Sequence, residues 1–216
     1  MNREVRERMD DDSGYLDEDD AGGGVDPDLI LAALDGQVRP HIGQIAPGQW
    51  VVGGHGQAGR VGAVLEVARI AEPDEPEAEV TCHFFYRSPD GDWQDAAGAG
   101  SDILEWPLPR PTIDDDDVTV EDIPVGEVCG VWLAALVGLA SAAVARLEAE
   151  YAGTSHPVEI PPSGLFVAPF AVFDATQTLG LVAFDAQGQE RGRHEVTLFD
   201  RVDAALKWPH PSLWPE

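Results

Sequence analysis

Basic residues are scarce in this 216-residue chain, which has 13 lysines and arginines against 40 aspartates and glutamates and a formal net charge of −27. Lys207 is the only lysine. Proteins that bind nucleic acids neutralise phosphates with clustered lysines and arginines, and the sequence has no such cluster. We therefore expect no nucleic-acid partner. A basic protein is a partner that this charge would favour.

Cysteine is also scarce. Cys82 and Cys129 are the two cysteines of the chain, and they form no C-x-x-C pair. A disulfide framework needs more cysteines, and a structural zinc site needs its cysteines at closer spacing. The first twenty residues lack the apolar core of a secretory signal. We therefore expect a cytoplasmic protein with reduced cysteines in its core.

Long runs that are both uncharged and mostly apolar are scarce, and the clearest is residues 128–145, which read VCGVWLAALVGLASAAVA. This length is at the lower limit for a membrane-spanning helix. The run merges into residues 145–151, where apolar and charged residues alternate with the period of a half-buried strand. We therefore favour buried strands at 130–139 and 143–151 over a membrane span. A helix over 129–150 is the alternative that the alanines favour.

The acids are concentrated in three segments, residues 1–28, 72–79 and 114–122, which together carry −19 of the net charge. Like charges repel and keep a chain extended, whereas a salt-adapted protein would spread its acids over the folded surface. We predict a disordered acidic tail at 1–25 and a linker rich in proline and aspartate at 107–124. The linker would join two β halves at 26–106 and 125–207, and a tail with proline and tryptophan would follow at 208–216.

Turn and cap signals predict the elements between these segments. Asp26, Pro27 and Gly36 suit the start and stop of a short helix. Turns at residues 88–91 and 185–188 separate short runs rich in β-branched and aromatic residues. Such spacing is typical of all-β domains. The predicted fold is mainly β, an antiparallel sandwich or barrel-like sheets with one short N-terminal helix.

One motif is enzyme-like: Gly54-x-Gly56-x-x-Gly59, directly after the apolar residues 50–52. A dinucleotide-binding fingerprint needs a helix after the glycines and an acid at the end of the next strand. Residues 61–70 are instead rich in valine, which favours a strand. Glu79, about twenty residues further on, stands at the wrong end of the next strand-like run. We therefore predict a glycine-rich hairpin loop between two antiparallel strands.

No other pattern supplies a catalytic or metal-binding constellation. Cys82 and His83 are adjacent on a predicted strand, so their side chains point to opposite faces. The acids of 114–122 lack the spacing and central glycine of a calcium loop. Ile103 stands where a nucleophile turn would need its last glycine. The histidines have no metal-site spacing: His41, His55, His83, His156, His194 and His210. We expect no catalytic residue, no cofactor and no metal.

Aromatic residues gather in residues 84–106. Most of them are expected in the core, but any that are exposed beside charged neighbours would form a binding patch. The candidate interaction patch consists of Tyr86, Arg87, Asp92, Trp93 and Trp106.

These observations favour a non-enzymatic interaction module that contacts a protein partner through its acidic segments and this patch. One alternative is an acidic inhibitor or immunity-type protein that masks a basic surface of its partner. The other is a small-ligand binder or enzyme with a site between the two β halves. That alternative requires a pocket that holds His55 or His83 with converging carboxylates. No motif is specific enough to name a family, and the sequence leaves the oligomeric state open.

Overall fold

The computed structural model describes residues 24–43, 45–70, 77–106, 117–128, 131–151, 153–172 and 178–197, with backbone alone at 97–102, 127–128 and 197. Most of the predicted acidic tail, residues 107–116 of the predicted linker and the whole tail at 208–216 lie outside these residues. The elements are α1 (Pro27–Leu34), β1 (Trp50–Ala58), β2 (Val61–Arg69), β3 (Glu77–Arg87), β4 (Trp93–Glu105), β5 (Val118–Asp122), β6 (Val125–Val128), β7 (Val131–Ala140), β8 (Arg146–Tyr151), β9 (Thr154–Val158), β10 (Leu165–Val172), β11 (Thr178–Phe184) and β12 (Glu190–Thr197).

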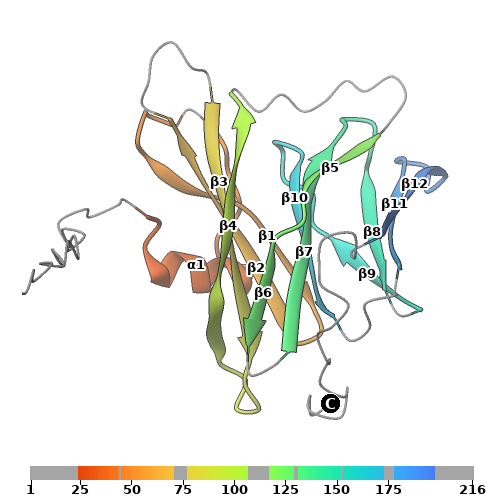
Figure 1. Ribbon diagram of the computed structural model, residues 1–216. Helices are drawn as coiled ribbons and strands as arrows, with labels where there is room; N and C mark the ends of the chain where they lie inside the picture. The colour runs from red at the N-terminus through yellow and green to blue at the C-terminus, as the bar shows by residue number, and fades with distance from the viewer. Residues whose placement is uncertain are drawn as a thin grey trace, which may run out of the picture.

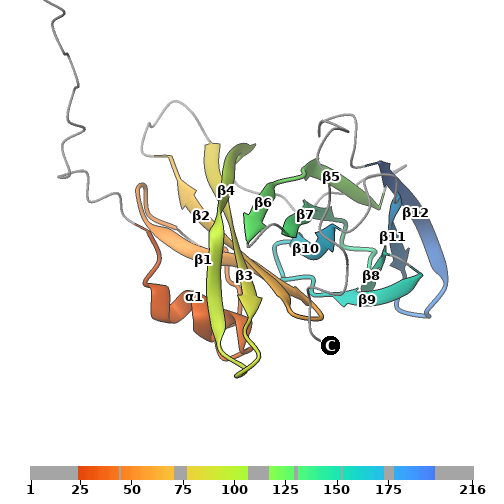
Figure 2. The ribbon, with the colours of Figure 1, turned by 60° about the horizontal axis from the view of Figure 1, so that its bottom comes forward.

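The strands form three antiparallel sheets. Sheet A has the order β1-β2-β3-β4, sheet B has the order β10-β7-β5 with β6 also paired to β7, and sheet C has the order β12-β11-β8-β9. The sheets stack in the order A, B, C, and α1 lies on the outer face of sheet A (Figures 1 and 2). The mainly β fold with antiparallel sheets and one short helix is therefore confirmed.

Each interface between layers has its own apolar core. Sheet B is covered on both faces, so β7 and β10 are almost continuously buried along their length. This explains the long uncharged run, because a strand that is buried on both faces needs no polar side. Large buried side chains in these cores include Leu65, Phe84 and Leu133 between sheets A and B, Leu147, Phe166 and Leu181 between sheets B and C, and Leu34, Val64 and Phe85 between α1 and sheet A.

The run at 128–145 contains β7 and the turn that leads to β8. The strands predicted at 130–139 and 143–151 are thus confirmed, and the helix over 129–150 is wrong. Within the residues that the structure describes, no helix has the length and apolarity to cross a bilayer.

The predicted hairpin between residues 50–52 and 61–70 is confirmed, since β1 and β2 pair antiparallel. The glycine loop is wrong, however, because Gly53, Gly54 and Gly56 lie within β1 and the turn begins only at Gly59. A Cβ at Gly56 would lie 2.3 Å from the carbonyl oxygen of Val167 on β10. Glycine is therefore needed because the backbones of sheets A and B approach each other closely here.

Local signals placed the helix and the turns correctly. Asp26 caps α1 by accepting a hydrogen bond from the Asp28 amide at 2.9 Å. The Gly91 and Gly188 amides close the two predicted turns by donating to the carbonyls of Ser88 and Asp185, each at 3.0 Å.

Part of the predicted linker is ordered sheet. Its described residues, 117–124, contain β5, which pairs with β7 in sheet B. The linker prediction is therefore wrong for these residues.

Candidate functional site

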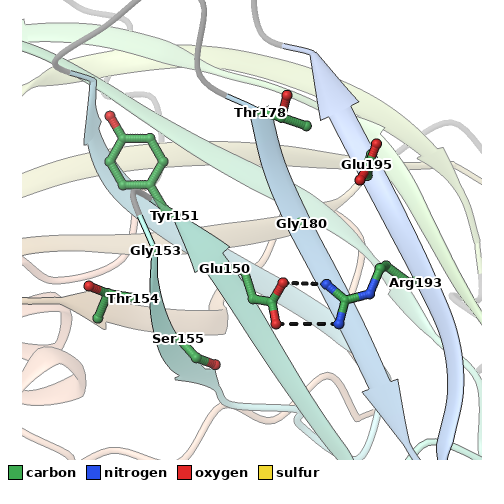
Figure 3. Close-up of a pocket in the computed structure, with 9 residues that line it drawn as sticks. All are labelled: Glu150, Tyr151, Gly153, Thr154, Ser155, Thr178, Gly180, Arg193 and Glu195. Atoms are coloured by element: carbon green, nitrogen blue, oxygen red, sulfur yellow. Dashed lines mark hydrogen bonds and ion pairs between the residues drawn. The ribbon is translucent and has the colours of Figure 1, made fainter.

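A pocket of about 380 Å³ lies on the outer face of sheet C (Figure 3). We call it the acidic pocket. It is lined by the ends of β8, β9, β11 and β12. Alternation along β8 directs Leu147 and Tyr151 toward the core and Glu150 to the outer face. The same half-buried pattern that identifies β8 in the sequence therefore supplies one carboxylate of the pocket.

The sheet register places four residues in one row across this face. Glu150 is opposite Ser155 on β9 and Gly180 on β11, and Gly180 is opposite Glu195 on β12. Gly180 has no side chain, so the row is open between the two glutamates. The pocket therefore has a backbone floor at β11 and carboxylates on either side.

Arg193 on β12 crosses this open floor to reach Glu150 (Figure 3). Its Nη1 donates to Glu150 Oε2, and its Nη2 lies 3.4 Å from Glu150 Oε1. Its Nε also lies 3.4 Å from Glu190 Oε1. The hydrogen bonds that Arg193 donates to Glu150 and to Glu190 raise the pKa of Arg193 above its usual value. The two carboxylate oxygens of Glu150 thus hold a guanidinium in the forked geometry that arginine favours.

Carboxylates outnumber guanidinium groups around the acidic pocket. The Glu195 side chain is exposed and has no hydrogen bond or ion pair within the described part of the chain. Glu148 is already engaged, because it pairs with Arg146 and accepts from Ser155 Oγ at 2.8 Å. Among the described residues, the charged side chains that these ion pairs and the pocket lining bring together are Glu148, Glu150, Glu190 and Glu195 against Arg146 and Arg193. The face therefore keeps a net negative charge after its internal pairs have formed.

A second pocket, of about 200 Å³, lies between the β1–β2 hairpin and the ends of β8, β9 and β10. We call it the apolar pocket. Tyr151 and Phe170 form its aromatic wall, with ring centroids 5.3 Å apart, and Ala58 and Ala171 add small apolar surfaces. His156 also lines it. Tyr151 lines both pockets, so the two lie on either side of the end of β8.

The structure divides the candidate interaction patch. The Arg87 guanidinium lies over the Trp93 ring at 4.5 Å from its centroid. Asp35, just after α1, joins them: its Oδ1 lies 3.3 Å from Arg87 Nη2 and accepts from Trp93 Nε1 at 3.2 Å. Asp92 is exposed nearby, and its amide donates to Ser88 Oγ at 3.2 Å.

The other two patch residues lie elsewhere. Tyr86 and Trp106 are partly buried and pack against the core between sheets A and B. Trp106 follows the end of β4 that is remote from Trp93. Asp35 was missed because only the docking of α1 brings it to Arg87.

Within the described part of the chain, His55 and His83 each lie close to one carboxylate, and neither lines the acidic pocket or the apolar pocket. His55 Nε2 on β1 lies 3.3 Å from Glu159 Oε2, across the stacked sheets. Burial lowers the pKa of His55, and the charge of Glu159 opposes this effect. His83 Nε2 lies 3.2 Å from Glu66 Oε2, close enough for an ion pair but without the angles of a hydrogen bond.

Other residues that were considered as catalytic or metal-binding candidates are buried or make hydrogen bonds within the fold. Cys82 is buried; burial raises the pKa of its thiol, and the charge of Asp122 raises it further. Asp117 accepts from Arg191 Nε at 2.7 Å and from Ser141 Oγ at 3.0 Å, and Arg191 holds its pKa below the usual range. Among the described residues, no three histidine, cysteine or acidic side chains are grouped so that they could hold a metal ion.

The arrangement on sheet C combines carboxylates, hydroxyl groups and an aromatic wall, which are groups suited to recognising basic and apolar side chains. The alternation at 145–151 identified the outward glutamates, but it did not identify Gly180 or Arg193 as their neighbours. Comparison of the chain with protein-family models, curated proteins and solved structures finds no match.

Proposed function

We propose that the protein is an interaction module that binds a basic segment of a protein partner at the outer face of sheet C. The observation that carries this proposal is the row of Glu150, Gly180 and Glu195, in which two carboxylates flank a glycine and a guanidinium already lies between them. Arg193 supports it by occupying part of the pocket floor as a partner's arginine would.

The chemistry favours a guanidinium or ammonium group as the bound group. Arginine binds carboxylates through two parallel hydrogen bonds, and Glu195 is a carboxylate without an internal partner among the described residues. The net charge of −27 would also draw a basic partner toward the protein and accelerate association at low salt.

A protein segment fits this site better than a small molecule. The Arg193 and Glu150 side chains are 42% and 40% exposed, so the acidic pocket is open to solvent. Small-molecule sites are usually enclosed and mostly apolar. An open polar face that retains charge is more typical of the rim of a protein interface.

The proposal is tested with a capped peptide of alternating glycine and arginine, titrated into the full chain by calorimetry. Replacing both Glu150 and Glu195 with glutamine should weaken binding by about tenfold. The matched control replaces the exposed Asp28 and Asp90 with asparagine, which removes the same charge elsewhere. Affinity should also fall as the ionic strength rises from about 10 to about 150 mM, because salt screens attraction between exposed charges.

Arg193→Gln gives a second test with an opposite sign. Removing the internal guanidinium frees Glu150, so binding of the arginine peptide should become stronger. Weaker or unchanged binding in this variant would contradict the proposed role of Glu150, because removing a competing guanidinium should leave this carboxylate free for the peptide. If the Glu150/Glu195 and Asp28/Asp90 variants lose the same affinity for the arginine peptide, net charge alone explains the loss. That result would overturn the proposed site.

A further inference from the structure

We propose that the apolar pocket receives an aromatic or large aliphatic side chain from the same partner segment whose basic residue lies in the acidic pocket. This inference rests on the proposed function and adds the chemistry of the partner: an arginine or lysine that is close in sequence to a bulky apolar residue.

The apolar pocket is suited to such a side chain because of its walls. Tyr151 and Phe170 present tilted rings, and Ala58 and Ala171 are too small to fill the space between them. Arg60 also lines the pocket, but its Nε donates to the Arg87 carbonyl at 2.7 Å, toward β3. An incoming ring would therefore meet mainly apolar surface.

The position of Tyr151 links the two pockets. Glu150 and Tyr151 are consecutive on β8, so their side chains lie on opposite faces of the strand end. A segment that crosses the end of sheet C beside the β8–β9 turn would therefore pass one pocket and then the other. Gly153 and Gly59, at the two rims, have open space where a Cβ would project. A partner segment could therefore approach the backbone at these two glycines.

Charge complementarity favours a peptide over a small apolar ligand as the occupant. Glu150 and Glu195 hold negative charge beside an apolar cavity, and a neutral apolar ligand would leave these carboxylates unused. A segment with a basic and an apolar residue satisfies both pockets at once. Each good anchor at an interface adds to the affinity when both can be engaged together.

The test uses capped peptides that contain one arginine and one phenylalanine, separated by zero, one or two glycines. Binding to the full chain is measured by amide chemical shifts in NMR titrations. At least one spacing should bind about tenfold more tightly than its matched peptide with alanine in place of phenylalanine. That peptide should shift the amides of both Gly153 and Gly59.

Ala58→Leu narrows the apolar pocket from the hairpin side. It should abolish the preference for phenylalanine over alanine and leave binding of the glycine–arginine peptide unchanged. Ala142→Leu, at an exposed position in the β7–β8 turn, is the matched control and should keep the preference. The peptide comparison in the unmodified protein stands even if Ala58→Leu does not fold.

The outcomes separate this inference from the proposed function. If phenylalanine and alanine peptides bind alike at every spacing while the glycine–arginine peptide still binds, the apolar pocket has no role and this inference fails alone. If no arginine peptide binds, the proposed function fails as well. If a peptide with glutamate in place of arginine binds as tightly, the pocket recognises apolar groups without a basic neighbour, and the inference is overturned.

Discussion

Replacing Gly56 with alanine should destabilise the protein by forcing sheets A and B apart. Gly56 lies in β1 where β10 crosses it, and an added Cβ would be 2.3 Å from the Val167 carbonyl oxygen and 2.9 Å from Pro169 Cδ. Cβ atoms essentially never approach other heavy atoms within 3.0 Å. Both contacts are stiff, since one is backbone and the other a proline ring, so the strain cannot be relieved by a side-chain rotation.

The magnitude follows from two opposing effects. Overpacking a well-packed core costs about 1–3 kcal/mol, whereas exchanging glycine for alanine returns about 0.4–1 kcal/mol by restricting the unfolded chain. Because the clash is with the backbone, we expect a net loss of about 2 kcal/mol in the free energy of unfolding. For a chain of this size that corresponds to a Tm lower by roughly 4–8 °C.

Urea unfolding followed by tryptophan fluorescence measures this difference as a shift of the midpoint at constant m-value. The matched control is Gly54→Ala, where the added Cβ would lie 3.4 Å from both the Leu165 carbonyl oxygen and Leu65 Cδ1, in ordinary contact. Its free energy of unfolding should stay within about 0.5 kcal/mol of the unmodified protein. The reasoning is refuted if Gly56→Ala unfolds at the same midpoint as the control.

Three further predictions concern a histidine, the buried thiol and the helix. Burial lowers the pKa of His55 in the folded protein below the unfolded value of 6.5. The unfolded chain therefore takes up a proton at this histidine more readily than the folded protein does. The free energy of unfolding should be highest above pH 6.5 and should decrease as the pH falls from there toward the folded pKa. Urea midpoints from about pH 7.5 to about pH 5 should show this loss reduced in His55→Gln; identical slopes would contradict it. Cys82 should resist N-ethylmaleimide in the folded protein and react after unfolding, because the pKa of its thiol is raised and its side chain is buried. Mass spectrometry of the peptide that contains Cys82 measures the labelling. Fast labelling of this peptide in the folded protein would disprove the prediction. Leu34→Ala should lower the free energy of unfolding by about 2–4 kcal/mol in urea titrations, since Leu34 is fully buried against sheet A; an unchanged value would mean that α1 does not dock.

The elements predicted correctly are those whose signals are local. The cap at Asp26, the turn that ends at Gly91 and the alternation along β8 each depend on residues within a few positions of one another. The glycines of β1 were misassigned because the strand that requires them, β10, is more than a hundred residues away in the chain. A glycine that admits a neighbouring backbone cannot be distinguished by its sequence from a glycine that forms a loop.

The candidate site was predictable only in part, for the same reason. The outward position of Glu150 follows from its place in β8, but its neighbours Gly180 and Arg193 come from β11 and β12. Exposed and less exposed residues also alternate along 191–196. No local pattern indicates, however, that β11 lies between β8 and β12, or that Gly180 of β11 is opposite the two glutamates.

Taken by itself, the sequence determined the charge, the β class, the helix and most of the strands, because propensity, period and turn chemistry act over short distances. Only the tertiary structure decided that three sheets stack with β7 and β10 in the middle layer. It also decided that Tyr151 separates an acidic from an apolar pocket. Both outcomes depend on which distant strands pair and which faces they bury, and that choice is made by the packing of the whole chain.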